Sequence, residues 1–227
     1  MYSAYLSTYS FQKTVIDLLF RATFLLAMVC LVLVVSEAHG AARPNSDAPS
    51  FTLSATDGSE VSLADLKGKT VVLEWLNYEC PFSKMHYDSG NIPQLQQKYS
   101  KDNVVWLSIA SSAKGKQGYF TANEYAMENK KFDNNANYVL LDADGKVARL
   151  YGAKTTPHMY VIGPDGKVRY NGAIDSIPSA NEKTLSEATP YAANAIAAVL
   201  AGKSPEPAAT QPYGCGIKYS STSGYDK

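Results

Sequence analysis

Residues 70–83 read TVVLEWLNYECPFS. The first seven are mostly β-branched, aromatic or aliphatic, a run typical of a strand buried on both faces of a sheet. Pro81 suits the first turn of a helix, where its missing N–H costs nothing. Cys80 is therefore expected where a strand ends and a helix begins. Unpaired backbone N–H groups and the helix dipole lower the pKa of a thiol there, so the sequence predicts thiol chemistry on an α/β scaffold.

The rest of the chain alternates strand-like and helix-like segments. Asp57-Gly58 predicts a tight turn in an opening β-hairpin, and Pro164-Asp165-Gly166 predicts a second hairpin near the end. The expected strands cover residues 51–54, 60–63, 70–76, 104–109, 138–141, 159–162 and 167–170. The expected helical segments cover 63–66, 81–88, 93–99, 121–129, 146–151 and 185–201. This order predicts a central mixed sheet covered on both faces, with an N-terminal β-hairpin extension.

The start of the chain has the pattern of a secretion signal. Lys13 and Arg21 precede an uncharged apolar run over residues 22–36, and the small residues of Ala38-His39-Gly40 suit a signal peptidase. The run is shorter than the roughly 20 residues of a spanning helix, although an uncleaved anchor is the alternative. We expect residues 1–40 to be removed, Cys30 included, and the protein to be periplasmic or extracellular.

Charge and cysteine count limit the remaining function classes. The chain has 21 basic and 21 acidic residues and a formal net charge of zero, so nothing favours nucleic acid or stable membrane insertion after signal removal. We expect one domain over residues 41–203 and a flexible tail over 204–227. An oxidising compartment permits disulfides, and two cysteines remain there, Cys80 and Cys215.

Several motifs in this order resemble the thioredoxin superfamily. The opening Ala48-Pro49-Ser50-Phe51-Thr52-Leu53 and the later Leu63-Ala64-Asp65-Leu66-Lys67-Gly68-Lys69 are similar to its redoxin branch, which includes the alkyl hydroperoxide reductase/thiol-specific antioxidant (AhpC/TSA) proteins. The Cys-Pro helix and the Thr-Pro strand complete the likeness, which spans residues 48–203. The resemblance implies a thioredoxin-like fold that exchanges electrons with thiols, disulfides or peroxides.

The resemblance also implies roles for individual residues. Cys80 matches the nucleophilic cysteine, and Pro157 matches the proline that follows a cis peptide bond in that fold. Thr156 would then turn its backbone toward the thiol and pair with an incoming peptide. Glu74 matches the buried acid that handles a cysteine's proton, so it is a candidate general base with a pKa raised by burial.

Two positions depart from the family patterns. Ser83 stands where the Cys-x-x-Cys form has its second cysteine, so Cys80 cannot close the usual local disulfide. The peroxidase motif has threonine or serine three residues before its cysteine and proline seven before, whereas this chain has Asn77 and Leu73. The site therefore does not match the standard peroxiredoxin motif.

Three roles stay open for Cys215. It attacks an oxidised or mixed-disulfide Cys80 and resolves it, or it is a bystander while an external thiol reductant resolves Cys80, or it forms a permanent structural disulfide with Cys80. Sequence does not set the separation of the two sulfurs.

A non-catalytic reading also stays open. Cys80, Met85, His86, His158 and Cys215 are soft or borderline ligands, so a thiolate and imidazoles on this scaffold suit copper, or the domain binds an exported client without turnover. The copper motif of the family uses two nearby cysteines, whereas this chain has a serine at residue 83 and therefore only Cys80 in that segment. We therefore expect no cofactor and no resident metal, and we expect a thiol-disulfide oxidoreductase or thiol peroxidase.

Overall fold

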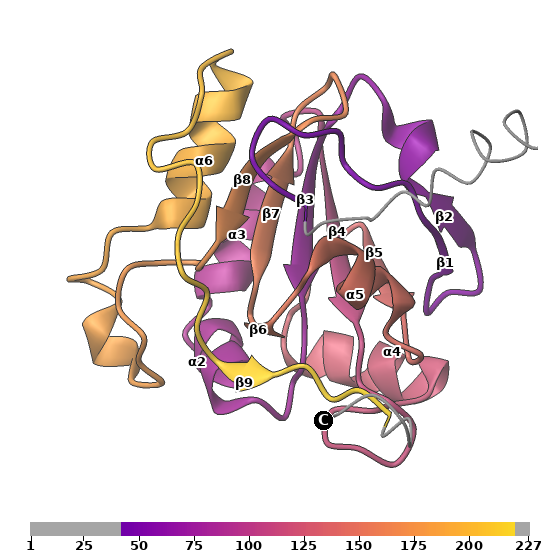
Figure 1. Ribbon diagram of the computed structural model, residues 1–227. Coiled ribbons are helices and arrows are strands. Elements are labelled where there is room, and N and C mark those ends of the chain that lie inside the picture. Colours follow the sequence, from indigo (N-terminus) through magenta and orange to yellow (C-terminus); the bar gives the residue numbers. More distant parts are fainter. Residues whose placement is uncertain (1–41, 221–227) are drawn as a thin grey trace, which may run out of the picture. The chain divides into compact units, whose positions relative to one another are not determined.

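The computed structural model describes residues 42–220 (Figure 1). Its centre is a five-stranded mixed sheet. The strand order is β5 (Tyr138–Leu141), β4 (Val104–Ala110), β3 (Thr70–Trp75), β7 (Met159–Ile162) and β8 (Val168–Gly172). β3 pairs in parallel with β4, and β4 with β5, whereas β7 is antiparallel to both β3 and β8. All six residues of β3 are buried, as the apolar run predicts.

One face of the sheet packs against the start of the chain and a short helix. The covering elements are the antiparallel hairpin β1 (Thr52–Ser54) and β2 (Glu60–Ser62), the 3₁₀ turn η1 (Leu63–Leu66) and helix α5 (Lys146–Tyr151). Leu73 and Trp75 of β3 point into this side, where they pack with Tyr151 and Tyr160. The alternation of side chains along β3 sends its other residues to the opposite face.

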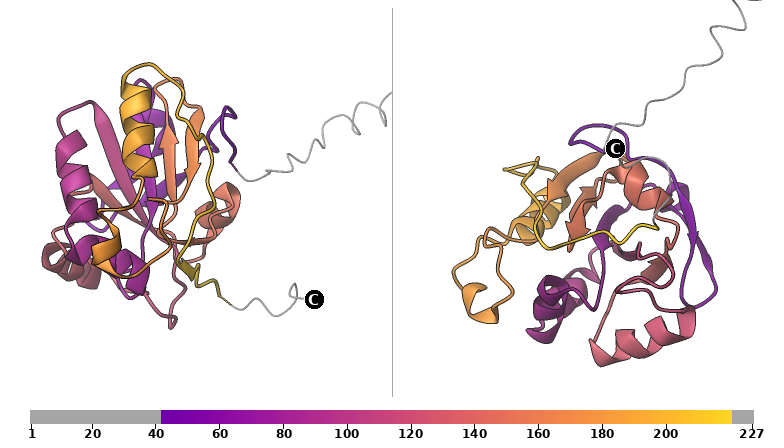
Figure 2. Two further views of the ribbon diagram at one scale, coloured as in Figure 1. Left: turned by 90° about the vertical axis from the view of Figure 1, so that its left-hand side faces the viewer. Right: turned by 60° about the horizontal axis from the view of Figure 1, so that its bottom comes forward.

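The opposite face carries the remaining helices. They are α2 (Pro81–Asp88), α3 (Asn91–Tyr99), α4 (Ala122–Lys131) and α6 (Tyr191–Leu200). Val72 and Trp106 lie in this second core with Tyr87, Ile92 and further apolar side chains of the helices. The sheet is therefore covered on both sides (Figure 2), which confirms the predicted fold class.

The C-terminal segment returns to the end of the sheet at which α2 begins. It passes β8, where Ala209 bridges Asn171, and then forms the two-residue strand β9 (Cys215–Gly216). β9 pairs antiparallel with β6 (Thr155–Thr156), and both lie near the start of α2 in Figure 1. These contacts are more extensive than the sequence led us to expect of a proline-bearing tail.

Most expected elements are present, but the last helix was placed wrongly. We expected it from residue 185, whereas α6 begins at Tyr191 and residues Glu182–Thr184 form only the short 3₁₀ turn η2. Pro190 explains the difference, because the residue before a proline is disfavoured in the helical conformation. The predicted signal peptide lies outside the described residues. Within residues 42–220, no helix combines the length and apolar character that crossing a bilayer requires.

Candidate functional site

Cys80 occupies the position before the first turn of α2. Its backbone is extended, with φ −77° and ψ 122°, and Pro81 is the first helical residue. The Cys80 N–H donates to the carbonyl of Asn77 at 3.1 Å, and the Cys80 carbonyl accepts from Lys84 at 2.8 Å. The Asn77 side chain accepts from the Glu79 N–H at 2.9 Å, which closes the loop between β3 and α2. The predicted strand-to-helix placement of the thiol is therefore what the fold produces.

Two backbone groups from distant parts of the chain meet the Cys80 sulfur. The thiol donates to the Thr156 carbonyl at 3.0 Å, and the Cys215 N–H donates to the sulfur at 3.4 Å. The peptide bond between Thr156 and Pro157 is cis. The structure thus brings together four residues that the sequence singled out, namely Cys80, Thr156, Pro157 and Cys215.

The two thiols have pKa values shifted in opposite directions. Burial raises the pKa of Cys80, but hydrogen bonding from Cys215 and Thr156 and the backbone N–H of Ser83 outweigh it, so the net pKa is lowered. Burial, followed by the hydrogen bond and charge of Cys80, raises the pKa of Cys215 to about 11. The two directions favour loss of a proton from Cys80 before loss of a proton from Cys215.

The Cys80 side chain is covered. Its exposed fraction is 0%, whereas Cys215 is half-buried. The cover includes the C-terminal segment, because the Cys215 amide contacts the sulfur and β9 pairs with β6 beside it. A two-residue strand carries no periodic pattern, so this arrangement could not be predicted from the sequence.

Gly214 allows the tail to approach this closely. Its φ is +126°, and a Cβ atom built there would lie 2.1 Å from the Thr156 carbonyl oxygen. No side chain fits at that distance, so the residue before Cys215 must be glycine for the tail to lie on β6. Thr156 was expected to pair with an incoming peptide; in this structure its partner is the chain's own Cys215.

Glu74 is fully buried beneath the site. It accepts hydrogen bonds from Trp106 Nε1 at 2.8 Å, the Tyr87 hydroxyl at 2.9 Å and the Ser108 hydroxyl at 3.1 Å, with Gln96 further away at 3.4 Å. Burial raises the pKa of Glu74, as predicted, and these hydrogen bonds oppose the rise. None of these four hydrogen bonds involves Cys80 or Cys215. The general-base role of Glu74 stays a prediction.

The two imidazoles that were candidates for binding copper, those of His86 and His158, have other polar partners. His158 accepts from the Lys154 N–H at 3.2 Å through Nδ1 and contacts Asn171 Oδ1 at 3.0 Å through Nε2. Both ring nitrogens of His86 also have polar partners, Asn91 and Tyr213. Among residues 42–220, no three histidine, cysteine or acidic side chains cluster as metal ligands do. The structure therefore does not bring Cys80, His86 and His158 together as a ligand set.

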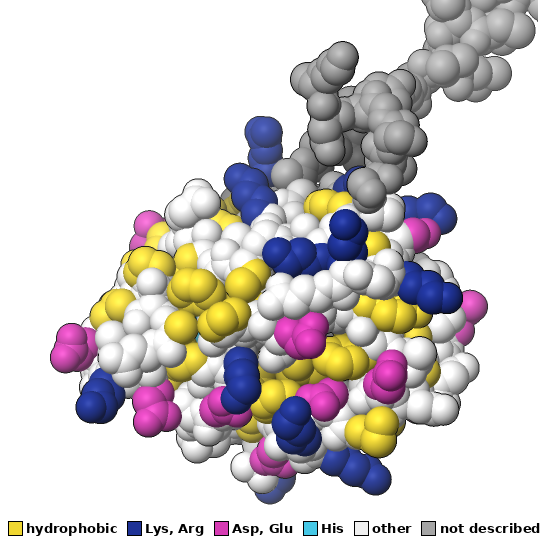
Figure 3. Space-filling model, turned by 90° about the horizontal axis from the view of Figure 1, so that it is seen from below, with side chains coloured by type: hydrophobic (Ala, Val, Ile, Leu, Met, Phe, Trp, Pro, Cys, Tyr) yellow, Lys and Arg dark blue, Asp and Glu magenta, His cyan; other side chains and the backbone are white. Residues whose placement is uncertain are grey.

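The surface around the site is mixed in character. Figure 3 shows the molecule from the end that carries β9, where hydrophobic side chains lie in clusters among lysine, arginine and acidic side chains. The Lys84 ammonium pairs with Asp88 and is exposed, so it does not contact the thiol. An open hollow of about 360 Å³ lies beside the start of α2, lined by Pro81, Met85 and Asn181 among others.

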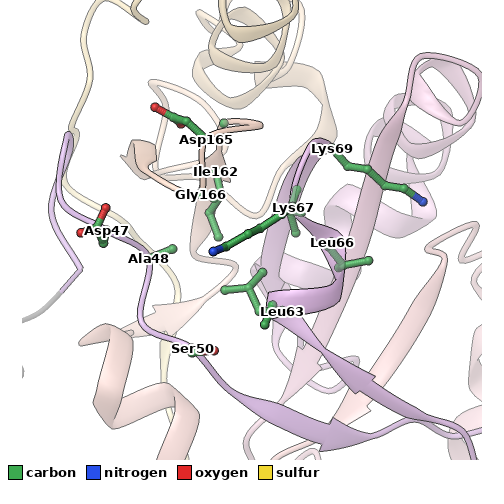
Figure 4. Close-up of a pocket in the computed structure, with 13 residues that line it drawn as sticks. Asp47, Ala48, Ser50, Leu63, Leu66, Lys67, Lys69, Ile162, Asp165 and Gly166 are labelled. Atoms are coloured by element: carbon green, nitrogen blue, oxygen red, sulfur yellow. The ribbon is translucent and has the colours of Figure 1, made fainter.

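A second cavity lies at the opposite end of the sheet. It has a volume of about 260 Å³ between the start of β3 and the β7–β8 turn, and Figure 4 shows Lys67 extending into it. Its lining includes Val71 at the start of β3 and Ile162 at the end of β7, whereas Cys80 follows the other end of β3. This cavity is separate from the thiol site.

Comparison with known proteins agrees with this geometry. The model of the AhpC/TSA family matches residues 44–171, more than half of the chain. The chain belongs to this family. Among curated proteins it is similar to the thiol-disulfide oxidoreductase ResA of Bacillus subtilis (strain 168), with 29% identity over 157 residues, 66% of this chain and 82% of that protein. ResA of Bacillus thuringiensis subsp. konkukian is 25% identical, over 63% of this chain and 78% of the relative.

Solved structures share the fold. A hypothetical protein from Sinorhizobium meliloti 1021 has a TM-score of 0.67 at 21% identity, covering 80% of this chain and 97% of its own. An uncharacterised conserved protein from Geobacillus kaustophilus has a TM-score of 0.64 at 25% identity, covering 79% and 94%. These results confirm the redoxin branch of the thioredoxin-like superfamily and support thiol-disulfide oxidoreductase chemistry.

Proposed function

We propose that this protein exchanges disulfides with partner molecules through Cys80 as nucleophile and Cys215 as the second sulfur. The observation that supports this most is the hydrogen bond from the Cys215 N–H to the Cys80 sulfur, 3.4 Å long, between residues 135 positions apart. A lowered pKa at Cys80 beside a raised pKa at Cys215 separates the attacking thiolate from a thiol that holds its proton.

The reaction has two steps. The Cys80 thiolate attacks a partner disulfide, so a Cys80–partner S–S bond forms and the other partner sulfur leaves as a thiolate that takes up a proton. Cys215 then loses its proton and attacks the Cys80 sulfur. A Cys80–Cys215 disulfide forms, and the partner leaves as a dithiol that has gained two electrons. An external thiol reductant returns the protein to the dithiol form by the same chemistry.

Thr156 and Glu74 support these steps in the proposal. The Thr156 backbone faces the sulfur and pairs with a cysteine-bearing strand, as it does here with Cys215. Glu74 is the proposed acceptor of the proton that Cys215 gives up, because a raised pKa suits a base that works near neutral pH.

Peroxide reduction is the second candidate, favoured by the family match. The thiolate would cleave the O–O bond, giving a Cys80 sulfenic acid and an alcohol or water, and Cys215 would then form the disulfide with loss of water. Asn77 and Leu73 still depart from the peroxidase motif, so we rank this reaction below disulfide exchange. We also propose export, which rests on residues 1–40 of the sequence and would place the pair in an oxidising compartment.

Single-cysteine variants test the proposed function. The reduced wild type, Cys80→Ser and Cys215→Ser are each given a protein disulfide or a peroxide, and the sulfur linkages are mapped by mass spectrometry. We expect Cys80→Ser to lose all turnover. Cys215→Ser should stop at a Cys80 mixed disulfide that excess small thiol releases.

Each contrary result identifies a different error. Full turnover in Cys80→Ser would show that the nucleophile is wrong. Unchanged turnover in Cys215→Ser would favour the external-thiol route, and a wild-type disulfide that no cellular-strength reductant opens would favour a permanent structural bond. Stoichiometric copper binding by the reduced wild type would revive the metal-binding alternative.

A further inference from the structure

Tyr213 anchors the C-terminal segment two residues before Cys215. Its hydroxyl donates to Asp175 Oδ1 at 2.7 Å and lies 3.0 Å from His86 Nε2. The exposed fraction of His86 is 0% and that of Asp175 is 4%, so the hydroxyl enters an enclosed polar pocket. The Tyr213 side chain therefore holds the C-terminal segment in addition to the backbone pairing of β9 with β6.

The polar partners form one directed chain of hydrogen bonds. The Asn91 side-chain amide lies 2.8 Å from His86 Nδ1 and can only donate to that nitrogen through its NH₂ group. Burial lowers the pKa of His86 to about 4, so the ring is neutral at neutral pH and its proton is on Nε2. His86 therefore donates to the Tyr213 hydroxyl, which in turn donates to Asp175.

The Tyr213 ring is held by the same helix that begins after Cys80. Its centroid lies 5.8 Å from that of Phe82, with the planes at 64°. Phe82 and His86 both belong to α2, and Asn91 begins α3. The anchor is therefore built on the element that positions the nucleophile. Movement of Tyr213 relative to α2 is also movement of Cys215 relative to Cys80.

On the basis of the proposed function, we propose that Tyr213 is a positioning residue whose anchored hydroxyl seats Cys215 on Cys80, and that its release opens Cys80 to a partner's disulfide. Only Gly214 separates the anchor from Cys215. The seated tail occupies Thr156, the edge that a partner strand would use, so tail and partner exclude each other.

The seated tail has two opposite effects on Cys80. It covers the sulfur, which slows attack on any external molecule. It also supplies the Cys215 hydrogen bonds that lower the pKa of Cys80, while its cover adds to the burial that raises this pKa, so its departure removes one contribution of each sign. The other groups acting on the sulfur are Thr156 from β6 and the Ser83 N–H from α2, while Lys218 acts on Cys215. Neither Thr156 nor Ser83 belongs to the tail, so both remain when the anchor is lost.

Alkylation of Cys80 measures both effects at once. The reduced full chain is treated with iodoacetamide between pH 5 and pH 10, and the modified Cys80 peptide is quantified by mass spectrometry. Tyr213→Phe removes only the hydroxyl. We expect its limiting rate at high pH to rise about tenfold, as for loss of one hydrogen bond to a charged group, while the midpoint of its pH profile reports the balance between the lost hydrogen bonds and the lost cover.

Tyr219→Phe is the matched control. It removes a hydroxyl from the same segment, one that donates to the Ala153 carbonyl at 3.4 Å, on the other side of Cys215. We expect its profile to stay within twofold of wild type. Asp175→Asn keeps an oxygen acceptor for Tyr213, so its rate should rise less than that of Tyr213→Phe.

The proposal is overturned if Tyr213→Phe keeps the wild-type profile, or if both tyrosine variants change equally. Urea unfolding of each variant identifies a general loss of stability. Alkylation requires no turnover, so Tyr213 is judged separately from the exchange reaction itself.

Discussion

Ser83 is the residue that gives this site its unusual pairing. It stands one helical turn after Cys80, with an exposed fraction of 0%, and its hydroxyl has no hydrogen-bond partner among residues 42–220. A buried hydroxyl without a partner costs free energy, so its side chain adds nothing evident to the stability of the fold. With no sulfur at residue 83, the cysteine that lies beside Cys80 in the described residues is Cys215.

His158 gives a prediction for stability against pH. Burial lowers the pKa of His158 from 6.5 to about 4. Between pH 6.5 and pH 4, His158 therefore binds a proton in the unfolded chain but not in the folded protein. Stability from the neutral ring is present above pH 6.5 and is lost as the pH falls toward 4. His158→Asn keeps an acceptor for Lys154. We expect this variant to lose about 2–3 kcal/mol less free energy of unfolding than wild type between pH 7 and pH 4.5.

Urea unfolding of wild type and His158→Asn at pH 7 and pH 4.5 checks the prediction. Burial also raises the pKa of Glu74 and of Asp142, but both carboxyls are present in the two proteins and their effects cancel in the comparison. Equal loss of stability in both proteins on acidification would contradict the assignment to His158.

At the scale of elements, β9 covers the Cys80 thiol, and Gly214 is the residue that allows β9 to pair with β6. Gly214→Ala places a methyl group 2.1 Å from the Thr156 carbonyl at φ +126°. We expect the tail to detach while the core stays folded, so that the free energy of unfolding falls by only about 1 kcal/mol. Hydrogen–deuterium exchange of residues 213–219 should become faster.

Gly202→Ala is the matched control for this prediction. Gly202 also has a positive φ, +69°, but nothing lies within 4 Å of a Cβ atom there. Its substitution tests backbone strain alone, away from the thiol. Slow exchange over residues 213–219 in Gly214→Ala would show that the pairing of β6 with β9 tolerates a side chain.

Elements with a repeating pattern were predictable, and those without one were not. The apolar run of β3 and the Pro81 start of α2 placed Cys80 correctly, and the family likeness placed Thr156 and Pro157 beside it. β9 has only two residues, and its pairing depends on contacts between segments about 60 residues apart. The contacts of Tyr213 with Asp175 and with His86, which the sequence singled out only as a metal ligand, were not predicted because nothing in their spacing links them. The Tyr-Gly-Cys-Gly segment itself was the one available signal.

At the scale of the whole molecule, a Cys80–Cys215 disulfide would join residues 135 positions apart. Closing so long a loop restricts the unfolded chain and stabilises the fold by about 4–5 kcal/mol in the chain-entropy account. We therefore expect the oxidised protein to unfold at a higher urea concentration than the reduced protein. Cys215→Ser should show one midpoint under both conditions, and equal midpoints for the wild type would contradict the linkage.

The long interval between the two sulfurs also sets an order of events during biosynthesis. A ribosome delivers Cys80 135 residues before Cys215, so the nascent chain carries an unpaired thiol throughout that interval. A protein with both cysteines in one helical turn completes its pair almost at once. In this chain Cys80 is made long before Cys215, so a disulfide between them can form only after translation has passed residue 215.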